Sequence, residues 1–294
     1  MRKWTVRYCF DTSALNRLHA DPACDDIATA LLATGTIRIS AYNVMEAAKT
    51  PEGQQRISLV KLLRRLSDNQ RPLDRPNTLV RAAARSYAER QPSGATTFTT
   101  NVDPDLDGVW VALNDPEVID DDARLEIVTW AKEWGDEYDR IVYGGRDRFQ
   151  ALIAKYRDAR RPSVADTFRS YLRNVDQIFT SLVAPIYQRE TGQTLSREEF
   201  DEMMREPIWP LYLGGYAYAL HQRAVQVNDY SRTRNAGGID LGQAVYLRLC
   251  DTFVTNDRAQ YRALRFLNRF ARASNLGAEV LPYGHFRRRL LPFG

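Results

Sequence analysis

The chain has 294 residues, of which 44% are hydrophobic and 27% are charged, and its formal net charge is +4. This composition supports a sizeable core and excludes a collagen-like or largely disordered chain. No stretch approaches the run of about 18 apolar residues that a membrane helix needs, and the N-terminal segment lacks the apolar part of a secretory signal. The three cysteines have no metal-ligand spacing and are typical of reduced thiols. We therefore expect a cytoplasmic protein without a membrane segment.

The first fifty residues alternate between strand and helix patterns. Val6–Phe10 is rich in β-branched and aromatic residues and ends at Asp11, which has N-cap chemistry for a short helix. Ala23–Ala33 has helical periodicity, Thr36–Ser40 is typical of a strand, and Asn43–Lys49 begins another helix.

The segment from about residue 50 to residue 235 has a different character, because strand-like alternation is scarce there. We expect a loop at Pro92–Pro116, which is rich in Thr, Asp, Gly and Pro, and helices elsewhere. The expected helices are Gln54–Ser67, Thr78–Arg90, Ala123–Trp134, Tyr138–Arg160, Val164–Glu190 and Trp209–Val227.

The strand and helix alternation returns after residue 237. Asp240–Leu249 and Arg258–Ser274 have helical patterns, and Thr252–Thr255 and Ala278–Leu281 have strand patterns. Alternation at both ends predicts an α/β fold with a parallel sheet flanked by helices. We expect one discontinuous domain, residues 1–50 and 236–294, interrupted by a large, mostly α-helical insertion at residues 51–235.

Four acidic residues are the candidate catalytic and metal-binding groups: Asp11, Glu46, Asp240 and Asp257. Asp11 and Asp257 follow strands, and open parallel sheets bind ligands at the carboxyl ends of their strands. Two like charges about 4 Å apart repel by about 4 kcal/mol at an effective dielectric near 20, so such a cluster needs a cation. Oxygen ligands without His or Cys favour Mg²⁺ or Mn²⁺. Each acid taken alone is also compatible with a helix cap or turn.

Three sequence blocks together resemble those of the PIN-domain nucleases. They are Phe10–Leu15, Ile39–Glu46 and Asp251–Asp257, with Asp240 opening the helix before the third block. The resemblance implies a PIN-like Rossmannoid sheet, a metal-dependent endonuclease site at the four acids, and supporting roles for Thr12, Ser13 and Thr255. The chain departs from the pattern at Asn43, where Ser or Thr is common, and in its long central insertion.

The resemblance also implies a substrate and partners. It favours single-stranded or structured RNA over DNA, and it suggests a toxin of a toxin–antitoxin pair with an inhibitory protein partner or a homodimeric state. The C-terminal part of the chain is basic, which is typical of a phosphate-binding segment or of a solvated helix face. The candidate nucleic-acid contacts are Arg258, Arg287, Arg288 and Arg289.

Two other functions stay open at this stage. One is a non-catalytic nucleic-acid-binding or protein-interaction scaffold with the same fold. The other is an aspartyl phosphatase, which Ser13 disfavours because such enzymes commonly have a second Asp at that position. Asp251 is a weaker site candidate, since it stands at the start of a strand.

Some further motifs are compatible with ligand binding but have plainer structural explanations. Asp103–Gly108 imitates the start of a calcium loop, yet Asn114 replaces the bidentate Glu. The aromatic run Trp209–Tyr218 is suited to stacking on bases or, more simply, to core packing.

Overall fold

The computed structural model describes residues 6–51, 53–68, 70–89, 104–113, 120–130, 132–133, 175–225, 238–272 and 278–291. The predicted helix at Tyr138–Arg160 lies outside these residues. Among the helices described, none is both long and apolar enough to cross a membrane.

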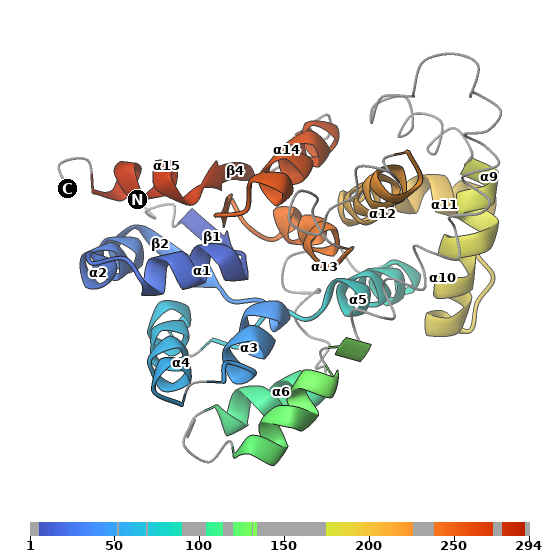
Figure 1. Ribbon diagram of the computed structural model, residues 1–294. Helices are drawn as coiled ribbons and strands as arrows, with labels where there is room; N and C mark the ends of the chain where they lie inside the picture. Colours follow the sequence, from blue (N-terminus) through green and yellow to red (C-terminus); the bar gives the residue numbers. More distant parts are fainter. Residues whose placement is uncertain are drawn as a thin grey trace.

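Four parallel strands form one sheet in the order β2-β1-β3-β4. The two outer strands are β2 (Gly35–Arg38) and β4 (Glu279–Pro282), and the two central ones are β1 (Val6–Phe10) and β3 (Thr252–Thr255). In the central pair Phe10 lies beside Val254. The predicted α/β class with a parallel sheet is therefore confirmed, and the two ends of the chain meet in its middle (Figure 1).

Successive strand residues face opposite sides of the sheet, so each face has its own core. Phe10, Val254 and Leu281 belong to one core, which contains α1 (Thr12–His19), α2 (Cys24–Thr34), α4 (Gly53–Ser67) and α15 (Tyr283–Leu290). Cys9, Phe253 and Val280 belong to the other, which contains α5 (Pro76–Ala88), α12 (Ile208–Val225), the 3₁₀ helix η3 (Gln243–Arg248) and α14 (Arg258–Arg272). Helices from the central part of the chain thus contribute to both cores.

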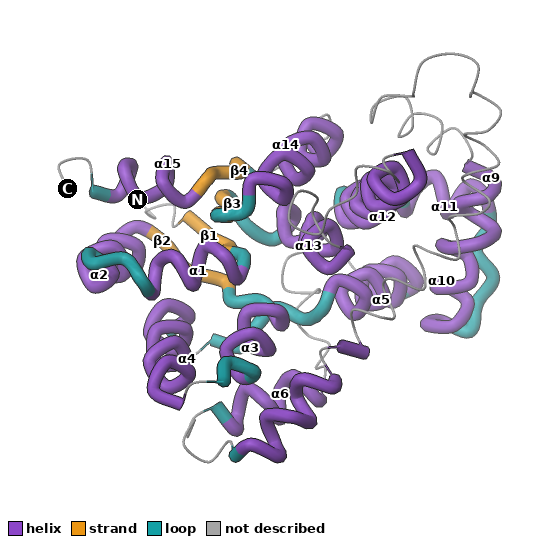
Figure 2. The backbone as a smooth tube through the Cα atoms, viewed as in Figure 1, coloured by secondary structure: helices purple, strands orange, loops and turns teal. Residues whose placement is uncertain are grey.

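The remaining described helices extend these two cores. Helices α3 (Ala41–Ala48) and α6 (Pro104–Ala112) belong to the first core. Helices α9 (Val175–Ile178), α10 (Ala184–Thr191) and α11 (Arg197–Met203) belong to the second, and α13 (Gly238–Gly242) packs against α12. Residues 121–130 are also helical. Helices predominate in the described part of the chain (Figure 2).

The predicted loop at Pro92–Pro116 is wrong for residues 104–112, which form α6. Leu106, Val109, Trp110 and Leu113 are buried at helical spacing, and Pro104 occupies the first helical position, where its missing N–H costs nothing. This apolar period outweighs the turn-forming Asp and Gly residues around it. Because the segment is helical, it also lacks the geometry of a calcium loop.

Two predicted helices are irregular in the structure. Only residues 175–190 of the predicted helix Val164–Glu190 lie within the described part of the chain, and they contain a π-helical stretch, Phe179–Val183, shortly before Pro185. A proline inside a helix removes a backbone hydrogen bond, and the π turn accommodates that loss. The one at Asp240–Leu249 consists of α13 followed by η3.

Candidate metal site

The candidate site lies where the central strands end and their helices diverge. Helix α1 leaves β1 toward one face of the sheet, and α14 leaves β3 toward the other. The backbone N–H of Asp11 donates to the carbonyl of Val254 at 3.0 Å, so the two strand ends are joined at this point. A divergence of this kind opens a crevice at the carboxyl edge of a parallel sheet.

Asp11 is the most enclosed of the four acids, with 3% of its surface exposed. Its Oδ1 accepts from the backbone N–H of Ala14, and its Oδ2 accepts from the hydroxyls of Ser13 and Thr255, each at 2.7 Å. Burial raises the pKa of Asp11, these hydrogen bonds counteract the rise, and nearby Asp257 adds to it. The carboxylate is therefore held in one orientation at an electrostatic cost.

Asp257 caps the start of α14 and is half-buried. Its Oδ1 accepts from the backbone N–H groups of Ala259 at 2.6 Å and Gln260 at 2.8 Å. Gln260 in turn donates from Nε2 to the backbone carbonyl of Asp240 at 3.2 Å. The strand end, α14 and the helix that carries Asp240 are thereby connected.

Glu46 lies on α3, whose start has a capping box between Ser40 and Asn43. Asn43 also donates from Nδ2 to the hydroxyl of Thr12 at 3.5 Å, which connects α3 with α1. The Glu46 carboxylate forms an ion pair with Lys49, and 42% of its side chain is exposed.

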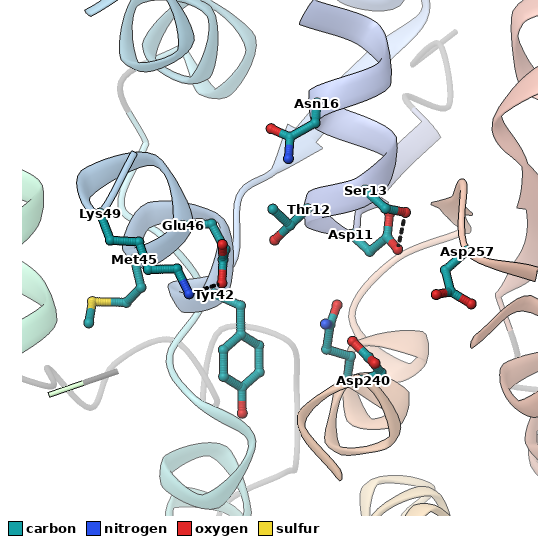
Figure 3. A pocket seen from close by; sticks show the side chains of 11 residues that line it. Asp11, Thr12, Ser13, Asn16, Tyr42, Met45, Glu46, Lys49, Asp240 and Asp257 are labelled. Atoms are coloured by element: carbon teal, nitrogen blue, oxygen red, sulfur yellow. Dashed lines mark hydrogen bonds and ion pairs between the residues drawn. The ribbon is translucent and has the colours of Figure 1, made fainter. Parts of the chain in front are cut away.

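One pocket of about 310 Å³ is lined by all four predicted acids. In Figure 3 Asp11, Asp240 and Asp257 lie on one side of it, and Glu46 lies on the opposite side beside Lys49. The predicted supporting residues Thr12 and Ser13 also line the pocket. Thr255 does not line it but donates a hydrogen bond to the Asp11 carboxylate. The pocket residues that the sequence did not identify are Asn16, Tyr42, Met45, Lys49 and Gln243.

Gln243 is the most informative of these additional residues. It is 3% exposed, and its Oε1 has no hydrogen-bond partner. A buried acceptor without a partner costs roughly 1–3 kcal/mol, and Gln243 is one of the residues that line the pocket. Its position three residues after Asp240, on the same side of a helical turn, is the sequence signal that could have identified it.

The chemistry of these donors fits a hard divalent cation, because carboxylate and amide oxygens are the ligands that Mg²⁺ and Mn²⁺ prefer. The four carboxylates do not yet form a compact metal site. Among the described residues, no three His, Cys, Asp or Glu side chains are grouped closely enough to hold a metal ion. Glu46 is instead paired with Lys49.

Other sequence candidates lie outside the pocket. Asp251 forms a two-point ion pair with Arg7 at the opposite, amino-terminal edge of the sheet, which is a structural role. Arg287 binds the buried Asp21, beyond the far end of α1, and Arg289 binds Glu279 through both of its terminal nitrogens. These two guanidiniums are engaged within the protein, which argues against the predicted phosphate contacts. Arg288 and Arg258 are exposed, and Arg258 directly follows Asp257.

The aromatic run Trp209–Tyr218 is mainly part of the core. Trp209 is 1% exposed and Tyr212 is 5% exposed. Core packing, and not stacking on bases, is therefore the interpretation that holds for these two rings.

Comparison with models of known families, with curated proteins and with solved structures found no match for the chain. The functional argument therefore rests on the residues of the pocket.

Proposed function

We propose that the protein is a metal-dependent nuclease with a PIN-like catalytic domain. The observation that carries the proposal is that Asp11, Glu46, Asp240 and Asp257, which come from four separate segments, line the same pocket. Asp11 and Asp257 also cap helices, but capping does not require Glu46 and Asp240 to line the same pocket.

The electrostatics of the pocket support a positively charged ligand. Burial and the neighbouring Asp257 both raise the pKa of Asp11. A cation between the carboxylates would offset both effects. Lys49 already provides one positive charge to Glu46, on the side of the pocket away from the aspartates.

Each residue has a distinct part in the proposed reaction. Asp11, Asp240 and Asp257 would hold Mg²⁺ or Mn²⁺, with Glu46 binding directly or through water. A bound divalent ion polarises a phosphodiester and activates water at neutral pH. Ser13, Thr255 and the Ala14 amide keep Asp11 oriented, and the first amides of α14 do the same for Asp257. Arg258, which is exposed and directly follows Asp257, would meet negative charge on the substrate.

The preference for RNA follows from the family resemblance alone. So does the role as a toxin with an inhibitory protein partner or a homodimeric state. We place the activity in the cytoplasm on the basis of the reduced cysteines.

A non-catalytic scaffold with a PIN-like fold is the second candidate. The ion pair between Glu46 and Lys49 and the open spacing of the carboxylates favour it. In that case the lysine would permanently neutralise the acid, and the pocket would bind a partner without cleaving it.

The deciding experiment is cleavage of a mixed single-stranded RNA pool by the purified protein. The reaction is run with Mn²⁺, with Mg²⁺ and with chelator, beside Asp11→Asn and the matched control Asp201→Asn, an exposed residue on α11. We expect metal-dependent cleavage that Asp11→Asn lowers by about 100-fold or more and that Asp201→Asn leaves unchanged. Nitrophenyl phosphate should stay intact. Cleavage that persists in chelator or in Asp11→Asn would refute the proposal, and no cleavage in any metal would favour the scaffold.

A further inference from the structure

Helix α14 carries a line of arginines along its outer side. Arg258, Arg262, Arg265 and Arg269 are all exposed and are spaced by four, three and four positions. Such spacing places them on one narrow strip of the helix surface. We call these four residues the α14 arginine stripe.

The opposite side of the helix is fixed in the core. Ala263, Leu264 and Leu267 are buried, and Gln260 is fully enclosed next to Thr255. The rotation of α14 is therefore determined by packing, and the stripe is held toward solvent. Arg265 also donates to the hydroxyl of Tyr261 at 3.2 Å, which positions one guanidinium beside an aromatic ring.

Most other arginines in the described part of the chain are paired with a carboxylate, whereas the four arginines of the stripe have no carboxylate partner among the described residues. Helix α14 contains no acidic residue, and no ion pair among the described residues involves the four arginines. Ion pairs do involve Arg7, Arg65, Arg71, Arg81, Arg85, Arg124, Arg189, Arg197, Arg248, Arg287 and Arg289. Four like charges along one helix repel one another, and that repulsion disappears when they meet a polyanion.

The stripe begins next to the candidate site. Arg258 directly follows Asp257, which lines the pocket, and α14 then runs away from the end of β3 (Figure 1). From Arg258 to Arg269 the helix rises by about 16 Å at ~1.5 Å per residue. At the rise of about 3.4 Å per stacked nucleotide, this length corresponds to about five nucleotides.

We propose that the α14 arginine stripe binds consecutive phosphates of a single nucleic-acid strand and leads that strand to the carboxylate pocket. The inference specifies the path of the substrate and thus rests on the proposed function. An anionic membrane is a poorer partner, because a membrane-binding helix must present its apolar side to the lipid, and the apolar side of α14 is buried.

The test measures binding rather than cleavage. The 294-residue chain is titrated, without divalent metal, against fluorescein-labelled single strands of 4, 8 and 12 nucleotides at several salt concentrations. The variant Arg262→Gln/Arg265→Gln/Arg269→Gln is compared with Lys61→Gln/Lys132→Gln/Arg205→Gln, which removes three exposed positive charges elsewhere. Circular dichroism and thermal unfolding confirm that both variants fold.

We expect the slope of log K against log salt to be less steep in the stripe variant by about two, since each phosphate contact on a single strand contributes about −0.7 to that slope. The control variant should change it much less. RNA and DNA strands should respond alike, because the stripe contacts phosphates, and the effect should be smallest for the 4-nucleotide strand.

Equal slopes for the two triple variants would overturn the inference. It would also be overturned if the stripe variant lost binding to phosphatidylserine vesicles while keeping its affinity for the strands. The experiments also distinguish a failure of this inference from a failure of the proposed function. A change in slope together with no cleavage in any metal would support phosphate binding by the stripe and refute the proposed catalysis.

Discussion

At the scale of single residues, the pocket contains groups whose placement is costly in the absence of a ligand. Asp11 is a buried carboxylate near another acid, and Gln243 is a buried amide whose Oε1 has no partner. Packing alone would favour apolar residues at both positions. Side chains that reduce stability in this way are common in ligand sites, where the ligand satisfies them.

Replacing Gln243 with leucine separates stability from binding. In chelator, Gln243→Leu should raise the free energy of unfolding by up to about 1–3 kcal/mol, because the unpaired acceptor is removed. It should also weaken Mn²⁺ binding by about 10- to 100-fold, the range found for groups that support metal ligands. Urea unfolding and Mn²⁺ titration measure the two effects. A loss of stability with unchanged metal affinity would make Gln243 a packing residue only.

At the scale of elements, the position of Asp240 depends on how closely α12 approaches α13. Gly215 lies in α12, and a Cβ atom added there would stand 2.5 Å from the carbonyl oxygen of Leu241. A Cβ atom is essentially never that close to another heavy atom, so the absence of a side chain at Gly215 permits the approach of the two helices. Gly215 thereby supports the position of Asp240 from outside the pocket.

Alanine at position 215 should therefore act on the pocket from a distance. Gly215→Ala is expected to push α13 outward, to lower the free energy of unfolding by about 1–3 kcal/mol through overpacking, and to reduce Mn²⁺ affinity by displacing Asp240. Gly108→Ala in α6 is the matched control, since nothing lies within 4 Å of its added Cβ. That change should be neutral or stabilising by up to about 1 kcal/mol. Unaltered metal affinity in Gly215→Ala would show that α13 adjusts without moving its acid.

At the scale of the whole molecule, the pocket exists only when the two ends of the chain are paired. The backbone bond between Asp11 and Val254 and the side-chain bond between Asp11 and Thr255 both join residues that are distant in sequence. A ligand in the pocket therefore binds the folded protein and not the unfolded chain. Its binding must stabilise the whole fold.

Divalent metal should accordingly raise the stability of the entire protein. At a hundredfold excess of Mn²⁺ over its Kd, the gain is about 2.7 kcal/mol. Asp11→Asn should lose this gain and, in chelator, should be more stable than the unsubstituted protein, because a neutral amide is less costly to bury than a charged carboxylate. Thermal unfolding with Mn²⁺, with Ca²⁺ and with chelator tests both expectations. The same Mn²⁺ gain in Asp11→Asn would place the metal elsewhere.

Local patterns in the sequence were sufficient to predict the four strands and their parallel arrangement. The strands at Val6–Phe10 and Thr252–Thr255 have the predicted bounds, those predicted at Thr36–Ser40 and Ala278–Leu281 are shifted by one or two residues, and helices alternating with strands favour parallel pairing. The positions of Asp11 and Asp257 followed from this, because the carboxyl ends of adjacent parallel strands share one edge. These features depend on neighbours along the chain, and the sequence records such neighbours directly.

Contacts between distant segments were decided only by the tertiary structure. The engagement of Arg287 with Asp21, the solvent-facing stripe on α14, the orphaned Oε1 of Gln243 and the approach at Gly215 all depend on which surfaces meet. An arginine has the same charge whether or not it forms an ion pair in the folded protein. The composition therefore could not show which arginines are paired with a carboxylate. The sequence by itself determined the strands and the acids that follow them, and packing determined which charges remain available to a ligand, because burial and pairing are properties of the folded chain.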